Sequence, residues 1–306
     1  FGGGKNGHPK SYSPPYKNVH LTPGKKTQLT DLIMEKTIAQ ITTAKQPFFL
    51  NYAPYAVHTP IQPVPHLVDK YKNKEATETH NNVAYATMIE NLDANIGLLV
   101  AVLKKEHQFD NTLLIFTSDN GGLYGITKQH PLRAGKGSYY EGGIREPFFF
   151  VWSNHIKSNS KSDIPITNID LFPTILESAG INYKQMSLDG NTVLPILKGQ
   201  VDELKRPLFW HFPVYLQRAF KSNTENRDPL FRTRPGSVVR YGDWKLHYYF
   251  ENNEIELYNL ANDIGEKNNV ASTNKKKVAE MMGYLKDWWK TTNAPIPSQL
   301  NPEFKL

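Results

Sequence analysis

Residues 113–122 read LLIFTSDNGG, an apolar run that ends abruptly in a carboxylate, an amide and two glycines. The run from Leu113 to Phe116 is typical of a buried strand, and the glycines predict a turn directly after it. In an open α/β sheet, ligands bind at the carboxyl ends of strands, so Asp119 and Asn120 lie where chemistry is usually done. Two neighbouring oxygen ligands suit a hard divalent cation. The alternative is a plain Asp-Asn-Gly-Gly turn that joins two strands.

The composition is that of a globular protein. The chain has 306 residues, 39% of them hydrophobic and 12% aromatic, which is enough to bury a sizeable core. No apolar run reaches the length of a membrane span, so no span is predicted. The chain begins with Phe1, and we expect a leader or a longer N-terminal segment to precede it. The absence of cysteine excludes disulfides, thiolate metal sites and cysteine nucleophiles, and leaves the redox compartment open.

The formal net charge of +7 favours an anionic partner. Nucleic acid is not expected, because the lysines are scattered and no basic helix or aromatic-interleaved RNA-binding motif occurs. In the stretch 206–240, seven basic residues face only Glu225 and Asp228. A sulfated or carboxylated polymer would suit such a surface, because guanidinium groups bind these anions in bidentate fashion. The basic residues are Arg206, Arg218, Lys221, Arg227, Arg232, Arg234 and Arg240.

The order of the predicted elements indicates an α/β domain over residues 1–205 and a smaller domain over 206–306. Alternating strands and helices in the first part are typical of a mainly parallel sheet flanked by helices. In the second part, short turn-separated strands and a final helix at 275–289 predict a small antiparallel sheet carrying one helix. The longest helix, 82–106, has an apolar stripe that includes Ile89 and that we expect to be buried. The strands predicted in the first part are 47–53, 113–118 and 147–152, and its helices are 30–43, 82–106 and 169–179.

With these residues in place, the chain resembles type I sulfatases of the alkaline-phosphatase-like superfamily over nearly its whole length. The resemblance implies an α/β fold whose mainly parallel sheet is flanked by helices, followed by a small C-terminal antiparallel sheet. It rests on several motifs in the family's order, none of which is specific alone. They are the loop 54–60 with its His-x-Pro, the Ser-Asp-Asn-Gly that ends the metal strand, Gly135-Lys136, the EGGIREP turn at 141–147, DLFPT at 170–174, Leu188-Asp189-Gly190 and the tail segments 242–246 and 256–260.

The resemblance implies a role for each candidate site residue. Asp119 and Asn120 would donate oxygens to a Ca²⁺, and Lys136 would hold a sulfate oxygen as a point charge. His58 would contact the sulfate and the leaving oxygen. His211, which lies between two aromatic residues on a predicted strand, is expected to hydrogen-bond a sugar of the substrate. In the alternative interpretation, His58 is a satisfied surface histidine and Lys136 a solvated loop lysine.

Some of the family's machinery is not in this chain. Missing are an N-terminal pair of aspartates, a Gly-Lys-x-His segment, and the Cys/Ser-x-Pro-x-Arg motif whose first residue becomes formylglycine. Ser13 to Lys17 imitates that last motif, but lysine replaces its arginine and the segment lies in a proline-rich loop. We therefore expect the formylglycine on a missing N-terminal segment, and expect this fragment alone to be inactive. Glu141 and Arg145 are expected to support the glycine turn and not to act on substrate.

The implied function is that of a sulfatase, a calcium-assisted sulfuric ester hydrolase. It would remove sulfate from a sulfated carbohydrate, a polysaccharide or its oligosaccharides, in the periplasm or outside the cell. The alternative from another class is a non-catalytic sulfated-glycan-binding protein on a degenerate sulfatase scaffold. A phosphate-ester hydrolase of the same superfamily would bring more Asp and His ligands for two metals than His58, Asp119 and Asn120 supply.

Overall fold

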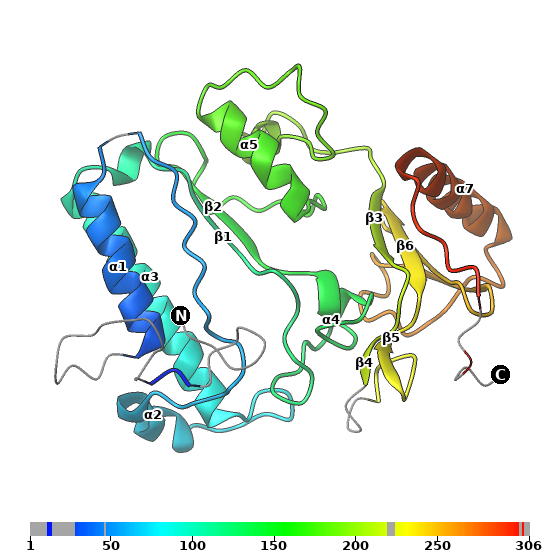
Figure 1. Cartoon of the computed structure of the whole chain (residues 1–306), viewed down its shortest axis with the longest axis horizontal. Coiled ribbons are helices and arrows are strands. Elements are labelled where there is room, and N and C mark those ends of the chain that lie inside the picture. Colours follow the sequence, from blue (N-terminus) through cyan, green and yellow to red (C-terminus); the bar gives the residue numbers. More distant parts are fainter. Residues whose placement is uncertain (1–10, 14–27, 46, 219–223, 300–301, 303–306) are drawn as a thin grey trace. The chain divides into compact units, whose positions relative to one another are not determined.

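The computed structural model describes residues 11–13, 28–45, 47–218, 224–299 and 302 (Figure 1). The chain divides into two compact units, residues 1–112 and 113–306, and each is described by itself. The domain boundary predicted at residue 205 lies inside the second unit and stays a prediction.

The regular secondary structure described in the first unit is helical, and long loops join the helices (Figure 1). Helix α3 begins after Asn82, whose side chain caps it by accepting a hydrogen bond from the backbone N–H of Tyr85. Tyr12, Leu29, Leu32 and Met88 form the buried core where α1 packs along α3. The elements are α1 (Leu29–Thr43), the 3-10 turn η1 (Pro65–Leu67), α2 (Val68–Lys72), α3 (Val83–Lys105) and the 3-10 turn η2 (Phe109–Asn111).

The buried face of α3 differs from the predicted apolar stripe. Ile89, predicted to be buried, is 47% exposed, whereas Asn91 and Asn95 are 7% and 4% exposed. Both amides donate to Asp31 Oδ1, at 3.0 and 2.9 Å, so α1 supplies the acceptor that makes their burial favourable. Among the described residues, α3 alone is long and apolar enough to cross a membrane by length and composition, a test that core helices of globular proteins also pass.

Two predicted strands of the second unit are confirmed, β1 (Leu114–Thr117) and β2 (Phe148–Val151). They pair antiparallel, with Thr117 opposite Phe148. The strand predicted at 47–53 joins no ladder within the described part of the chain. The parallel pairing expected for the first part is thus not seen among these residues; a mainly parallel sheet can still carry an antiparallel strand at its edge.

The C-terminal part of the second unit is the predicted antiparallel sheet with one helix (Figure 1). Its strand order is β3-β6-β7-β8. Val239, Leu246 and Leu257 pair across three strands and pack, fully buried, on Met281 and Leu285 of the helix. The elements are β3 (Leu208–Phe212), β6 (Gly236–Tyr241), β7 (Trp244–Tyr249), β8 (Glu254–Asn259) and α7 (Lys275–Thr292), together with the separate pair β4 (Leu216–Arg218) and β5 (Phe231–Thr233).

The face of this sheet opposite α7 is also buried, and it is charged. Lys245 and His247 flank Leu246 on β7 and are both 0% exposed. Side chains alternate between the two faces of a strand, so these two polar groups point away from α7. They meet the connection between β1 and β2, which contains the one-turn helix α4 (Glu141–Ile144). The remaining short helices of the unit are η3 (Asn168–Asp170), α5 (Leu171–Ser178) and α6 (Leu194–Leu197).

Candidate functional site

Asp119 and Asn120 lie directly beyond the carboxyl end of β1, where the sequence predicted them. The two side chains touch, since Asn120 Nδ2 donates to Asp119 Oδ1 at 2.9 Å. Ser118 Oγ donates to the Asn120 carbonyl oxygen at 3.1 Å and steadies the backbone between them. This arrangement fixes the amide orientation so that Asn120 Oδ1 and Asp119 Oδ2 are the oxygens left to bind a ligand.

A second acidic group, Glu146, borders Asp119 and was not anticipated from the sequence. Continuing the β1–β2 register from the pair Thr117–Phe148 places Glu146 opposite Asp119. Burial, and then the negative charge of Asp119, raise the pKa of Glu146 to about 7. Its Oε1 is buried and has no hydrogen-bond partner within the described residues. Negative charge is therefore crowded at this end of the strand, and a cation would relieve it.

Glycines let three backbone segments meet beside these acids. Gly121 N donates to the Gly143 carbonyl oxygen at 3.0 Å, and a Cβ on Gly121 would lie 1.9 Å from the Gly142 oxygen. Lys136 N donates to the Gly122 carbonyl oxygen at 2.9 Å. Any side chain at Gly121 would collide with backbone, so only glycine permits this approach. The segment of Asp119 and Asn120, the segment of Lys136 and the glycine turn of α4 thus share one junction.

Lys136 itself is half-buried within this junction. Its side chain forms no ion pair with an acidic residue of the described chain. An ammonium group that is held by its backbone and not neutralised by a carboxylate suits the binding of an anion. This geometry is compatible with the role expected for Lys136, the binding of a sulfate oxygen, which stays a prediction.

His58 belongs to the first unit and lies in the loop that follows residues 47–53. Its Nδ1 is 2.8 Å from the Thr59 carbonyl oxygen. A carbonyl only accepts, so Nδ1 carries the proton and Nε2 is the nitrogen suited to meet a substrate. The ring packs edge-on to Tyr55 with 5.1 Å between centroids, and the Tyr12 hydroxyl lies 2.8 Å from the His58 carbonyl oxygen. The loop is well held, and its contact with sulfate stays a prediction.

His211 is engaged inside the small sheet. Its Nδ1 lies 2.7 Å from Ser237 Oγ and its Nε2 lies 3.0 Å from the Pro295 carbonyl oxygen. Trp289 Nε1 donates to the same Ser237 oxygen at 2.9 Å, which leaves the serine hydroxyl to donate to Nδ1. Burial lowers the pKa of His211, in keeping with a neutral ring. Both ring nitrogens are thus engaged, so the predicted substrate role, still untested, would require one of these contacts to be exchanged.

Most arginines of the basic stretch are ion-paired with acids distant in sequence. The charge excess that the sequence displays between residues 206 and 240 is therefore largely neutralised in the fold, and it supports a polyanion-binding surface less than expected. Lys221 and the side chain of Arg218 lie outside the described part. The pairs are Arg206 with Asp170, Arg227 with Glu254 and Glu256, Arg234 with Asp228 and Glu251, and Arg240 with Glu141.

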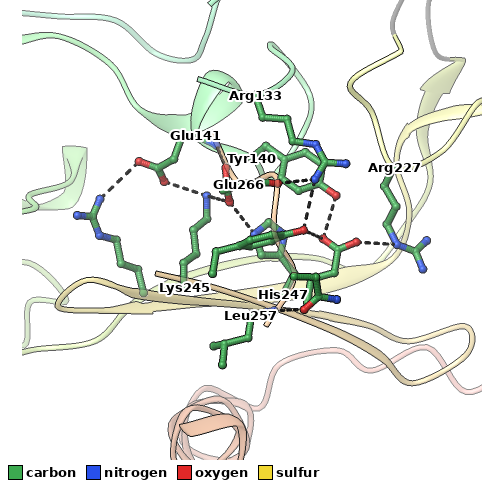
Figure 2. A network of polar contacts seen from close by, with 12 residues as sticks. Arg133, Tyr140, Glu141, Arg227, Lys245, His247, Leu257 and Glu266 are labelled. Atoms are coloured by element: carbon green, nitrogen blue, oxygen red, sulfur yellow. Dashed lines mark hydrogen bonds and ion pairs between the residues drawn. The ribbon is translucent and has the colours of Figure 1, made fainter. Parts of the chain in front are cut away.

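A buried ionic network holds α4 from the side of the small sheet (Figure 2). Lys245 Nζ lies 2.9 Å from Glu141 Oε1 and 2.9 Å from Glu266 Oε1. Glu266 Oε2 accepts from the Glu141 backbone N–H at 2.5 Å, and Glu266 Oε1 lies 3.0 Å from His247 Nε2. Arg145, expected to support the turn, lies 3.5 Å from Glu141. Sequence reasoning missed Lys245, His247 and Glu266. Lys245 and His247 alternate with apolar residues along β7, a pattern that is equally typical of a solvated strand face, and Glu266 lies beyond β8 with no local signal.

Glu266→Gln is expected to remove part of the acid sensitivity of the protein. Burial alone raises the pKa of Glu266, but the charge of Lys245 and the hydrogen bond with His247 outweigh it and lower the pKa from 4.5 to about 2. A carboxyl whose pKa is lower in the folded state stabilises that state above its unfolded pKa. This contribution is lost as the pH falls from about 4.5 towards about 2.

The measurement is the thermal midpoint as a function of pH. Glu266→Gln should be less stable than the wild type near neutral pH and should lose less stability on acidification. Glu203→Gln, which alters an exposed pair with Lys205, is the control and should keep the wild-type slope. Equal slopes for Glu266→Gln and the wild type would contradict the assignment.

The donor set at the end of β1 fits a hard cation in part. Asp119 and Asn120 offer a carboxylate and an amide oxygen, whereas Ca²⁺ takes six to eight oxygens in proteins. No group of three or more His, Asp or Glu side chains suited to a metal occurs among the described residues, so further ligands would be backbone or amide oxygens, waters, or groups outside these residues. Zinc fits less well, because it favours imidazole or thiolate ligands.

Solved structures support the fold. That of Ps i-CgsB in complex with k-i-k-neocarrahexaose is 29% identical and aligns with a TM-score of 0.73, covering 92% of this chain and 59% of that one. That of BT4656 with D-glucosamine-2-N,6-O-disulfate aligns with a TM-score of 0.71 over 90% of this chain, but at 20% identity it bears on the fold alone. The alkaline-phosphatase-like α/β class is thereby confirmed.

Sequence comparisons agree with the motifs. The sulfatase family model matches residues 1–181, and the model described as N-sulphoglucosamine sulphohydrolase, C-terminal, matches residues 135–292. A sulfatase of Formosa agariphila is 34% identical over 91% of this chain and 53% of its own length. The uncharacterized sulfatase YdeN of Escherichia coli is 28% identical over 94% of this chain and 55% of its own length, so the chain spans about half the length of these curated relatives. The chain belongs to the sulfatase family, as its motifs implied.

Proposed function

We propose that the protein containing this chain hydrolyses sulfate esters of a sulfated carbohydrate, with Asp119 and Asn120 contributing to a calcium site. The observation that carries the proposal is the junction at which Lys136 N bonds to the Gly122 carbonyl oxygen at 2.9 Å. It keeps an ammonium group, which has no acidic partner among the described residues, on a segment adjoining the two oxygen donors. Cleavage of a sulfate ester needs both the ammonium group and a cation held by the oxygen donors, because the sulfate oxygens and the leaving oxygen gain negative charge as the ester breaks.

Each residue has a defined task in this proposal. Lys136 binds one sulfate oxygen and orients the ester. His58, with the proton of Nδ1 fixed by the Thr59 carbonyl, presents Nε2, which when protonated would donate a proton to the leaving alkoxide. A bound Ca²⁺ supplies positive charge that offsets the charge developing on the sulfate oxygens. The attacking group is expected to be a formylglycine on a segment outside this chain.

The substrate class is proposed from chemistry and kinship. The structural relative at 29% identity holds a neocarrahexaose, an oligosaccharide. Polymeric sulfated glycans do not cross membranes, so the proposal includes a periplasmic or extracellular location. No nucleic-acid partner is included.

The decisive test is sulfate release by the full-length protein. Sulfated oligosaccharides, neocarrahexaose among them, are incubated with the protein, and free sulfate is measured by ion chromatography. Lys136→Ala is expected to lower kcat/KM by about 10²–10³-fold, the effect typical of losing one group that stabilises developing negative charge.

Lys128→Ala, a change in the same connection between β1 and α4, is the matched control and should keep the wild-type rate. An unchanged rate in Lys136→Ala would refute the assignment of the lysine. Saturable binding of the glycan by the wild type with no sulfate released would instead favour a non-catalytic glycan-binding protein.

A further inference from the structure

The glycine turn of α4 is the common support of the two segments assigned to cation and sulfate binding. Gly143 accepts from Gly121, which follows Asn120 directly, at 3.0 Å. Gly142 N donates to the Arg133 carbonyl oxygen at 2.9 Å, at the beginning of the segment that leads to Lys136. A Cβ on Gly142 would lie 2.4 Å from that oxygen. Because these contacts are backbone to backbone, a shift of the turn would move both segments.

The small C-terminal sheet holds this turn through charge. Figure 2 shows Lys245 reaching from its strand to Glu141 and Glu266, with His247 beside Glu266. Glu266 binds the turn twice over, through Lys245 to the Glu141 carboxylate and directly to the Glu141 backbone N–H. Arg240 Nη1 lies 3.6 Å from Glu141 Oε2 on the other side. Glu141 Oε1 therefore faces Lys245, whereas Oε2 faces Arg240 and Arg145, and these cations on both oxygens fix the rotation of the carboxylate as well as its position.

A second set of contacts braces the residue before the turn. The Arg133 guanidinium lies 3.8 Å from the ring centre of Tyr140, and Tyr140 Oη donates to Glu256 Oε2 at 2.9 Å. Arg133 Nη1 also donates to the Glu266 carbonyl oxygen at 2.8 Å. Both ends of the segment 133–141 are thus attached to the sheet and to the loop of Glu266.

Stability alone is a poor explanation for this design. Burying charges costs free energy, and apolar residues of similar volume are often as stabilising or more so. The opposite face of the same sheet is filled in that apolar way, against α7. What a buried ionic network adds is direction, because its hydrogen bonds hold only in one geometry. A directional support is useful where the supported groups must stand at fixed positions.

We propose that Glu141, Lys245 and Glu266 are positioning residues that set the placement of Asp119 and Asn120 relative to Lys136. The expected effect on kcat rests on the proposed function, whereas the expected effect on the placement of the loops rests on the geometry alone. The C-terminal sheet thereby takes part in organising the catalytic loops.

The test is Lys245→Met in the full-length protein, read out by hydrogen–deuterium exchange and by kinetics. Methionine keeps an unbranched side chain, one atom shorter than that of lysine, and removes the charge. Amide exchange is expected to rise about tenfold or more in peptides covering 119–123 and 135–143, while the β3–β6 ladder stays protected. A misplacement of this kind should lower kcat by roughly 10- to 100-fold with KM changed by less than about threefold.

Arg206→Met is the matched control. It also removes the cation from a buried carboxylate of the same unit, since Asp170 is 1% exposed, but it lies on another part of the unit. It should lower the thermal midpoint comparably, with kcat and loop exchange within about twofold of the wild type. Should Lys245→Met fail to fold, Glu141→Gln replaces it, with kcat and loop exchange as the same two readouts. Its amide oxygen still accepts a hydrogen bond from Lys245, so the variant should fold, while the negative charge that pairs with the cations is lost.

The outcomes separate the two proposals. Wild-type kcat, or wild-type exchange in both peptides, in a folded variant would overturn the positioning role and leave the proposed function standing. A wild type that releases no sulfate, together with raised loop exchange in Lys245→Met, would support the positioning role and refute the proposed function. A kcat lowered equally in Arg206→Met and Lys245→Met would reduce the effect to general destabilisation and overturn the inference.

Discussion

Asp119→Ala in the full-length protein is expected to lower sulfate release by about 10²–10³-fold. The substitution removes the only carboxylate of the pair at the end of β1, and the amide of Asn120 alone is a weak ligand for a hard cation. It also removes the acceptor that orients Asn120 Nδ2 at 2.9 Å. The measurement is initial sulfate release, with calcium content determined on the same preparation by atomic emission.

The control is Asp110→Ala, which removes an exposed carboxylate of the 3-10 turn η2, outside the second unit. It should keep both the wild-type rate and the wild-type calcium content. Full activity in Asp119→Ala would refute the cation assignment. Stoichiometric zinc in the active wild type would contradict the choice of calcium, because these oxygen donors do not suit zinc.

Gly121→Ala is expected to destabilise the second unit by about 3 kcal/mol, at the upper end of what overpacking usually causes. The added Cβ would lie 1.9 Å from the Gly142 carbonyl oxygen, and backbone atoms cannot yield as a flexible side chain can. The segment of Asp119 would have to part from the glycine turn, with loss of the hydrogen bond from Gly121 to Gly143. The measurement is the free energy of unfolding from denaturant titration, together with sulfate release.

Gly283→Ala is the matched control for this change. Gly283 lies within α7 of the same unit, and beyond its chain neighbours and the local helix backbone no atom lies within 4 Å of a Cβ added there. Alanine in a helix interior should therefore stabilise by about 0.5–1 kcal/mol. If Gly121→Ala unfolded at the same denaturant concentration as the wild type, the close approach of these backbones would be wrong.

Local patterns predicted the elements whose formation depends on local causes. The apolar run from Leu113 to Phe116 predicted β1, and the turn-separated segments after residue 205 predicted the small sheet. The amphipathic end of the chain gave α7, with an error of three residues at its end. These succeed because strand alternation, turns and helix periodicity are written in neighbouring residues. The proximity of Lys136 to the Asp119 segment was expected only from family resemblance, and the glycine contacts supply its physical reason.

The ionic support of the glycine turn could not be predicted from the sequence. Lys245 and Glu141 are 104 positions apart, and nothing local distinguishes Lys245 from a lysine on a solvated strand face. The same limit applied to α3, where Asn91 is buried because Asp31, 60 positions away, accepts from it. Buried polar groups depend on partners, and partners depend on the tertiary fold.

The two faces of the four-stranded sheet impose different rules on sequence change. On the side of α7, apolar residues such as Val239 and Leu246 can be exchanged for other apolar residues, as long as the total side-chain volume is conserved. On the other side, loss of one charged residue leaves its partner as an unpaired charge in the buried interior, which is strongly destabilising. Joint replacement of the whole set by apolar residues can leave the stability unchanged. Homologous chains should therefore vary freely along the first face. Glu141, Lys245 and Glu266 should instead be kept together or replaced together, and such covariation would indicate that the three residues are energetically coupled.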